Sequence, residues 1–359
     1  MMYVDCHNDT VLKVVYGGED FRSGSPNLHI DLPKIRSLET ALTLFCAAWA
    51  DPVFQGEKAV AQSLALLRRL RTLVSDCAEH LAIATRMADV EDHARTGKTS
   101  VVLAVEGGQA INDDVNELES LYEAGARLMT LGHLEAPRWV GSSHGDDARG
   151  LDALGRDVVR AMNRLGMVVD VAHASETSIR DVARVSAHPI VSSHSCAKGV
   201  FDTERGLSDD AIRSIAETGG VVGIMFFPDF LTEIPRAEVN VLTWITEEFA
   251  RINGDPSLTL EEKAERKLPL FAEKYPRPDV IPSVDAVFEH IDYVVHLVGE
   301  DHVGIGSDFD GIPYCCSGLE DIGKLGNLVD LMRRRGYSED SIAKVMGTNL
   351  FRVMKAVMG

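Results

Sequence analysis

Residues 167–194 read MVVDVAHASETSIRDVARVSAHPIVSSH, and this stretch contains the unit that predicts the fold. Two short apolar runs, Met167–His173 and Pro189–His194, flank an amphipathic segment at Thr177–Val185. Continuous apolar runs of this length are typical of parallel strands that are buried on both faces. The order strand, helix, strand therefore predicts two parallel strands joined by a helix, and each strand ends in a histidine.

The same alternation recurs along the whole chain. Glycines such as Gly125, Gly166 and Gly219 fall where each helix should end before the next strand. Strand then helix, eight times, favours an α/β fold of the closed (β/α)8 TIM-type barrel over an open sheet. The other predicted strands are Tyr3–His7, Leu42–Ala48, Val101–Glu106, Arg127–His133, Val221–Phe226 and Val303–Asp308. The other predicted helices are Glu57–Cys77, Asn116–Ala124, Leu154–Leu165 and Ser208–Thr218.

One interval in this series is too long for a simple connection. Between Pro228 and Ser283 the sequence contains two helix-like pieces, Glu238–Asn253 and Leu260–Lys274, followed by several prolines. We interpret residues 228–283 as a helical insertion after the seventh strand, on a loop of the kind with which barrels elaborate substrate specificity. The remainder of residues 1–359 is expected to form a single barrel domain, because α/β barrels often use this much chain as one domain.

The charge balance limits the class of partner. With 36 basic and 55 acidic residues the net charge is −19, which argues against nucleic acid or an anionic membrane as the main partner. No apolar run reaches the roughly 18 residues of a membrane-spanning helix, and the N-terminus lacks the pattern of a signal peptide. The six cysteines are scattered without a Cys-x-x-Cys pair, as expected for reduced core residues. We therefore expect a cytoplasmic protein.

Side chains that can bind metals stand at the ends of the predicted strands. Because the carboxyl ends of barrel strands meet on one face, where catalysis occurs, these side chains should lie close together. Imidazole and carboxylate ligands without thiolates suit a catalytic zinc site, and a carboxylate from the third strand is central enough to bridge two ions. The residues concerned are His7, Asp9, Glu106, His133, His173, His194 and Asp308. The other histidines are predicted to be solvated or capping residues: His29, His80, His93, His144, His188, His290, His296 and His302.

These motifs resemble those of the renal or membrane dipeptidase family, which are zinc-dependent barrels of the amidohydrolase type. The resemblance covers nearly the whole chain. It is carried by Asp5–Asp9, Ala104–Gly107, Leu128–His133, Asn163–Ser175, Pro189–Ser195, Gly304–Gly311 and Gly347–Val353.

The resemblance implies two Zn²⁺ ions per subunit. His7 and Asp9 would bind one ion, and Glu106 would bridge the two. His173 and His194 would bind the second ion. The enzyme would be a homodimeric dipeptidase in which a hydroxide between the metals attacks the peptide bond of L,L- and L,D-dipeptides.

Three further residues receive roles from the resemblance. His133 would stabilise the oxyanion that develops on the scissile carbonyl. Asp308 would contact the first metal and move a proton to the leaving amine. Arg205 would pair with the substrate's terminal carboxylate, for which a planar guanidinium is well suited.

Each role has an alternative in the sequence. His133 could be structural, Arg205 could be a surface residue, and Asp310 could replace Asp308, because strand alternation points both aspartates the same way. Where many family members have tyrosines after the seventh strand, this chain has Phe226, Phe227 and Phe230, and the loss of these hydroxyls bears on substrate preference. The alternative functions are an amidohydrolase acting on an N-acyl amino acid or a lactam, and a catalytically inactive barrel that serves as a binding protein.

Overall fold

Eight parallel strands close into a barrel in the computed structural model, which describes residues 2–133, 135–144, 148–234, 241–269 and 280–359. The ring closes because β2 pairs with both β1 and β4, and β10 pairs with β1. The predicted (β/α)8 barrel is therefore confirmed. In ring order the strands are β1 (Met2–Asn8), β2 (Ala41–Trp49), β4 (Thr99–Glu106), β5 (Ala126–Thr130), β6 (Val168–Asp170), β7 (Val191–Ala197), β9 (Val221–Ile224) and β10 (Val303–Ile305).

Two very short strands lie outside this ring and were not predicted. β3 (Leu81–Ile83) pairs with β4, and β8 (Gly206–Leu207) pairs with β7. β8 matters for the site described below, because it holds the backbone next to Arg205 against the end of β7.

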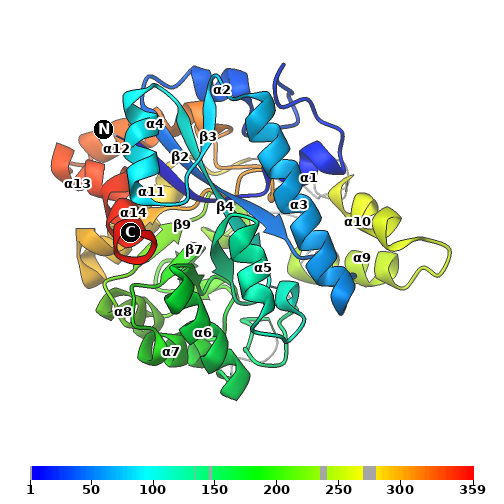
Figure 1. Cartoon of the computed structure of the whole chain (residues 1–359). Helices are drawn as coiled ribbons and strands as arrows, with labels where there is room; N and C mark the ends of the chain where they lie inside the picture. Colours follow the sequence, from blue (N-terminus) through cyan, green and yellow to red (C-terminus); the bar gives the residue numbers. More distant parts are fainter. Residues whose placement is uncertain (1, 134, 145–147, 235–240, 270–279) are drawn as a thin grey trace.

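Helices surround the barrel, as Figure 1 shows. The five predicted helices whose ranges could be compared with the structure occur within one residue of their expected bounds, and Ser175 and Ser208 cap two of them through their side chains. The helices are α1 (Thr10–Val15), α2 (Leu32–Arg36), α3 (Glu57–Asp76), α4 (Met87–Arg95), α5 (Glu117–Glu123), α6 (Ala153–Leu165), α7 (Glu176–Val185), α8 (Asp209–Glu217), α9 (Val241–Asn253), α10 (Leu260–Pro269), α11 (Asp285–Val298), α12 (Leu325–Arg334), α13 (Glu339–Ala343) and α14 (Asn349–Met358). Short helical turns are η1 (Gly108–Ile111), η2 (Pro228–Phe230), η4 (Glu300–His302), η5 (Ile322–Lys324) and η6 (Lys344–Thr348).

The inside of the barrel is apolar at the end where the strands begin. Small and medium side chains such as Val4, Val102 and Val168 form one buried cluster with Leu350 and Met354 of α14. The C-terminal helix therefore closes this end of the barrel, and a larger apolar layer fills the space between strands and outer helices. The opposite end of the barrel is left for polar side chains.

Helices α9 and α10 lie between β9 and β10 in sequence, where two helices were predicted. In Figure 1 they project on the side opposite the marked chain ends. The predicted ends of these helices at 238–240 and 270–274 lie outside the described residues. Within the described part of the chain, no helix combines the length and the apolar character needed to cross a membrane.

Several strands end earlier than predicted. β6 ends at Asp170 rather than His173, and β10 ends at Ile305 rather than Asp308. His173 and Asp308 both have a φ of 63°, in the left-handed region that a β-strand cannot continue through and that non-glycine residues rarely adopt. Backbone strain of this kind is concentrated at functional sites, and both residues belong to the predicted metal cluster.

Candidate metal centre

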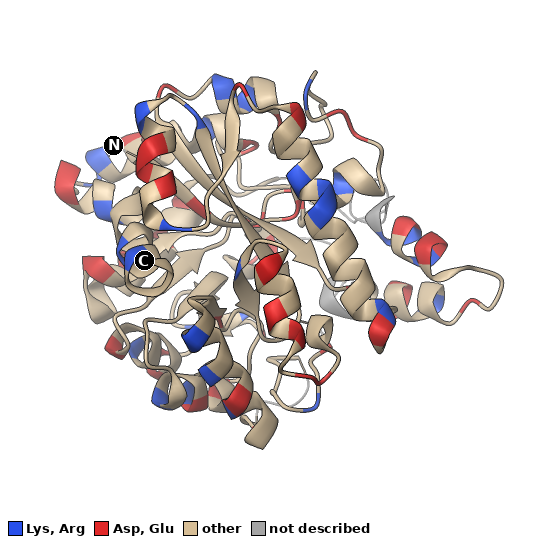
Figure 2. Ribbon diagram, in the orientation of Figure 1, with Lys and Arg blue, Asp and Glu red and all other residues tan. Residues whose placement is uncertain are grey.

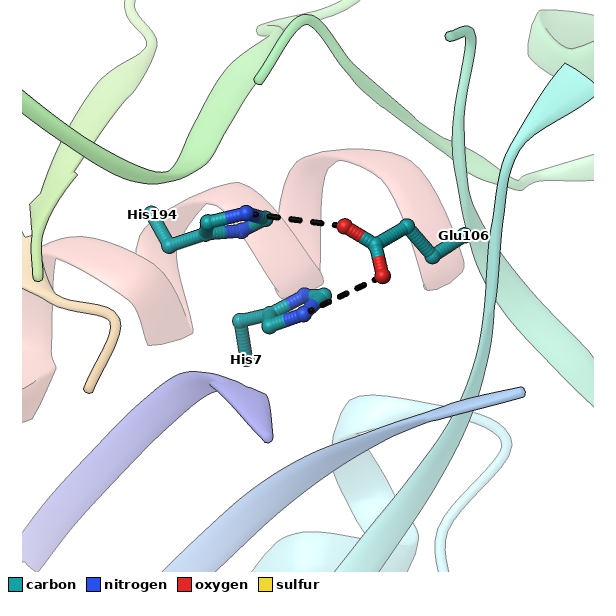
Figure 3. A group of neighbouring side chains, drawn as sticks. All are labelled: His7, Glu106 and His194. Carbon is teal, nitrogen blue, oxygen red and sulfur yellow. Dashed lines mark ion pairs between the residues drawn. The ribbon is translucent and has the colours of Figure 1, made fainter. Parts of the chain in front are cut away.

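Every residue predicted to bind a metal lies at the open end of the barrel, and Glu106 is at the centre. Its Oε2 atom is 3.7 Å from Nε2 of His7, while its Oε1 atom is 3.5 Å from Nε2 of His194 (Figure 3). His173 is on the same side as His194, with Nε2 3.3 Å from Oε1 of Glu106. The two carboxylate oxygens thus face two different groups of ligands.

The first group gathers around His7. Its Nε2 atom is 3.4 Å from Oδ2 of Asp9 and 4.0 Å from Oδ1 of Asp308. These three residues could hold one cation together, and His7, Glu106 and His194 form a second such set. His133 completes a third set with Glu106 and His173, since its Nε2 is 3.9 Å from Oε1 of Glu106. His133 therefore lies in the cluster itself.

Irregular strand pairing turns two of the histidines into the barrel. Between Asp5 and Asn8, β1 advances three residues while β2 advances two. Val4 and Cys6 belong to the interior cluster, so regular alternation would point His7 towards the outer helices, and the extra residue reverses this direction. The pairing of β7 with β9 shifts in the same way between Ser192 and Ser195, and this interval contains His194.

A hydrogen-bonded relay fixes the orientation of His194. Ser193 Oγ donates to Oδ2 of Asp170 at 2.6 Å, and Nδ1 of His194 lies 2.9 Å from the same hydroxyl. Because the hydroxyl proton is used on Asp170, Nδ1–H of His194 donates to Ser193 and Nε2 keeps its lone pair. Asp170 also accepts from Thr130 Oγ1 at 2.5 Å, so the relay joins β5, β6 and β7. Sequence reasoning missed this relay, although a charged residue inside the apolar run MVVDVAH was a usable signal.

Asp310 does not share the position of Asp308. Its carboxylate accepts from Thr10 Oγ1 at 2.7 Å and from the backbone N–H of His29 at 2.7 Å, and it forms an ion pair with Lys13. The expectation that alternation points both aspartates the same way was wrong, because both residues have positive φ and lie beyond the end of β10. Asp308 faces His7, whereas Asp310 ties the first loop to the last.

Burial and mutual repulsion set the protonation of the cluster. Burial raises the pKa of Glu106 far above its usual value and raises the pKa of Asp308 to about 7, and the nearby Asp9 adds to both increases. Burial would lower the pKa of His7, but the surrounding carboxylates outweigh this effect and raise it to about 10. Burial lowers the pKa of His173, and the positive charge of Arg205 lowers it further. The chain thus places groups with opposing proton affinities within a few ångströms of one another.

The donor set fits divalent cations. Nε2 of His173 and Nε2 of His194 face each other at 2.9 Å, and a cation between them would accept both lone pairs. Among the described residues, both ring nitrogens of His7 and Oδ1 of Asp9 are buried without a hydrogen-bond partner. Buried polar atoms are rarely left unpaired, and Nε2 of His7 faces Asp9, Glu106 and Asp308, so a cation bound there would supply the missing partner. Nitrogen and oxygen donors without sulfur suit zinc or a similar metal.

Arg205 lies beneath the same opening rather than on the surface. Its side chain is 4% exposed, and one guanidinium N–H donates to the backbone carbonyl of His194 at 3.1 Å. The surface alternative for Arg205 is therefore wrong. A buried guanidinium with spare donors is suited to an anionic ligand group.

Two histidines differ from their predicted solvated or capping roles. His144 is in the site, with its ring 6.3 Å from that of His173 and its Nδ1 3.3 Å from Glu204, and burial lowers its pKa to about 4. His290 is fully buried, accepting from the backbone N–H of Ala197 at Nδ1. Neither ends a strand, so the rule that found the other site histidines could not find them.

Comparison with known proteins agrees with this geometry. A model of the membrane dipeptidase family, peptidase family M19, matches residues 1–358. Dipeptidase tcpJ of Claviceps purpurea (strain 20.1) is 32% identical over 298 residues, which are 82% of this chain and 59% of that protein. The chain thus spans less than two thirds of the length of that relative.

Two solved structures share the fold over the whole chain. The probable dipeptidase PvdM from Pseudomonas aeruginosa has 26% identity and a TM-score of 0.82, covering 100% of this chain and 96% of that one. A metallopeptidase from Rhodobacter sphaeroides, bound to a phosphinate mimic of the dipeptide L-Ala-D-Ala, has 25% identity and a TM-score of 0.79, covering 99% of both chains. The chain belongs to the membrane dipeptidase family, peptidase family M19.

Proposed function

We propose that the protein is a dipeptidase that depends on two divalent cations, with zinc as the metal. The observation that carries this proposal is the position of Glu106, whose two oxygens face separate ligand groups. His7 and Asp9, with Asp308 beside them, would hold one ion. His173 and His194, whose Nε2 atoms are 2.9 Å apart, would hold the other. Bound together, two such ions activate water as a nucleophile and polarise a carbonyl group.

The remaining residues of the site would handle the substrate. Arg205 would bind the terminal carboxylate, which restricts the substrate to a peptide that ends at this point. His133 would donate a hydrogen bond to the scissile carbonyl oxygen and so stabilise the negative charge that develops there. Asp308, whose Oδ1 is 4.0 Å from Nε2 of His7, would accept a proton from the nucleophilic water and return it to the leaving nitrogen.

The stereochemistry of the substrate is part of the proposal. The Rhodobacter sphaeroides structure was solved with a mimic of L-Ala-D-Ala. We propose that the present protein also accepts L,D-dipeptides beside L,L-dipeptides, since Arg205 would hold a terminal carboxylate in either series. The homodimeric state and the cytoplasmic location stay predictions from the sequence.

The test combines metal analysis with a substrate panel. Wild-type protein loaded with zinc should contain two ions per chain and should hydrolyse dipeptides faster than N-acyl amino acids or lactams. Glu106→Gln should bind fewer ions and lose activity, while Glu135→Gln, a change of an exposed carboxylate on the loop after β5, should match wild type. Full zinc content and activity in Glu106→Gln would refute the bridging role, and faster lactam or N-acyl turnover would favour the other amidohydrolase activity.

A further inference from the structure

The two ends of a bound dipeptide would lie on opposite sides of the barrel opening. In ring order, β4, β5 and β6 separate β2 from β7 on one side, and β1, β10 and β9 separate them on the other. Arg205 is held against the end of β7 through β8, and Trp49 is the last residue of β2. If the substrate carboxylate pairs with Arg205 and its carbonyl lies beside His133, its N-terminal residue points towards Trp49.

An aromatic pair occupies this side of the opening. The ring of Trp49 is 5.4 Å from the ring of His133 and 6.2 Å from the ring of Phe249 on α9. In the barrel, Trp49 pairs directly with Glu106. Trp49 is thus a neighbour of both the central carboxylate and the histidine beside the scissile bond.

A buried ion pair fixes α10 to the same place. Six of the ten residues of α10 are charged, and Figure 2 shows these charges along the helix. Lys267 is the exception to an otherwise solvated face, because its side chain is 2% exposed and its Nζ is 2.6 Å from Oδ1 of Asp51. The ammonium also lies 5.6 Å from the ring centroid of Trp49 and 5.2 Å from that of Phe249. The pair joins α10 to the loop that follows β2.

The geometry leaves polar groups here that a ligand could use. Among the described residues, Nε1 of Trp49 and Oδ2 of Asp51 are buried and have no hydrogen-bond partner. Because the ammonium of Lys267 neutralises Asp51, the wall carries little net charge. Aromatic faces without net charge favour apolar side chains.

We propose that Trp49 and Phe249 form the subsite for the side chain of the substrate's N-terminal residue. Lys267 and Asp51 are positioning residues, since they hold α9 and α10 against this subsite. The subsite accepts apolar and aromatic side chains, because the rings of Trp49 and Phe249 line it and the charge of Lys267 is paired with Asp51. The inference rests on the proposed dipeptidase function and adds which side chain the enzyme selects and where.

Two dipeptide series test the subsite. In the Xaa-Ala series (Xaa is Gly, Leu, Phe or Lys), kcat/KM of wild type should be highest for Leu or Phe. Trp49→Ala should reduce the Phe-Ala to Gly-Ala ratio about tenfold or more, which is the usual effect of losing apolar pocket contact. The ratios in the Ala-Xaa series should not change, because that side chain lies on the Arg205 side. Equal changes in both series, or no change in either, would overturn the assignment.

The ion pair is tested by separating charge from packing. Lys267→Met should raise KM for Phe-Ala with little change in kcat, at unchanged metal content. Adding Asp51→Asn should restore part of the loss, because the lone buried carboxylate is then removed. Equal KM in wild type and Lys267→Met would refute the positioning role.

The same proteins distinguish this inference from the proposed function. A wild type that hydrolyses no dipeptide would refute the dipeptidase function. The increase in Tm that each dipeptide causes would then still show whether Trp49 contacts the Xaa side chain. A Tm increase that is larger for Phe-Ala than for Gly-Ala in wild type, and equal in Trp49→Ala, supports the subsite. Equal increases in wild type contradict it.

Discussion

Removing the hydroxyl of Ser193 should weaken metal binding without removing any ligand. In Ser193→Ala, Nδ1–H of His194 loses its acceptor at 2.9 Å, and Asp170 loses a donor at 2.6 Å. Asp170 keeps its hydrogen bonds from Thr130 Oγ1 and from the backbone N–H groups of Ala172 and Ser193, so the unpaired group is the buried Nδ1–H of His194, which costs on the order of 1–3 kcal/mol unless it rearranges. For His194 the cheapest rearrangement is rotation or the other tautomer, and either one takes the Nε2 lone pair from the metal. Loss of such a supporting hydrogen bond typically reduces metal affinity about 10–100-fold.

The assay is competition for zinc with a chromophoric chelator at constant pH, which gives the affinity of each ion without using activity. Ser192→Ala is the matched control, because Ser192 is the adjacent buried serine and its Oγ bonds to Ser195 at 2.6 Å rather than to a ligand. One of the two zinc affinities should fall about 10–100-fold in Ser193→Ala, and both should match wild type in Ser192→Ala. Equal zinc affinities in the two variants would refute the orienting role of the relay.

Three other predictions concern separate parts of the site and its support. Asp308→Asn should lower kcat about 10²–10⁴-fold because the proton carrier is lost, whereas Asp310→Asn should mainly lower Tm. Steady-state kinetics and thermal melts distinguish the two variants. A large loss of kcat in Asp310→Asn but not in Asp308→Asn would assign the proton transfer to Asp310. Burial lowers the pKa of His290 from 6.5 to about 4, so the unfolded state binds more protons between these values and stability is lost as pH falls below 6.5. His290→Gln should therefore reduce the change in unfolding free energy across this pH window by up to about 3 kcal/mol. Denaturant titrations at several pH values measure this change, and an equal pH dependence in wild type and variant would contradict the prediction. Dialysis against a chelator should lower Tm, and zinc should restore it, because cations relieve the repulsion among Glu106, Asp9 and Asp308. An equal Tm with and without metal would contradict metal binding at this cluster.

The sequence was sufficient for the barrel and for bringing the candidate metal ligands to one end of it. Both depend on local regularities: apolar runs predict buried parallel strands, and every such strand carries its last residues to one end of the barrel. For this reason Glu106, His133 and His194 could be grouped although they are distant in sequence. The family resemblance supplied roles for Arg205 and Asp308 that no local pattern distinguishes.

The direction in which these side chains point could not be predicted from the sequence, and only the tertiary structure decided it. Alternation failed for His7 and His194 because strand pairing shifts there, and for Asp308 and Asp310 because the backbone is left-handed. Pairing register depends on the partner strand, which a single sequence does not specify.

The sequence alone therefore determined that the residues near the predicted strand ends, such as His7, Glu106 and His194, reach the open end of the barrel, since this follows from chain order. Only the tertiary structure decided which of them face one another and what supports them. The relay through Asp170 and Ser193, and the burial of Lys267 against Asp51, join elements that are distant in sequence. The composition of its own charged helix predicts that Lys267 is solvated. It is buried because β2 and the loop after it supply the ring of Trp49 and the carboxylate of Asp51, and α9 supplies the ring of Phe249. Such contacts are properties of packing and have no signature in local composition.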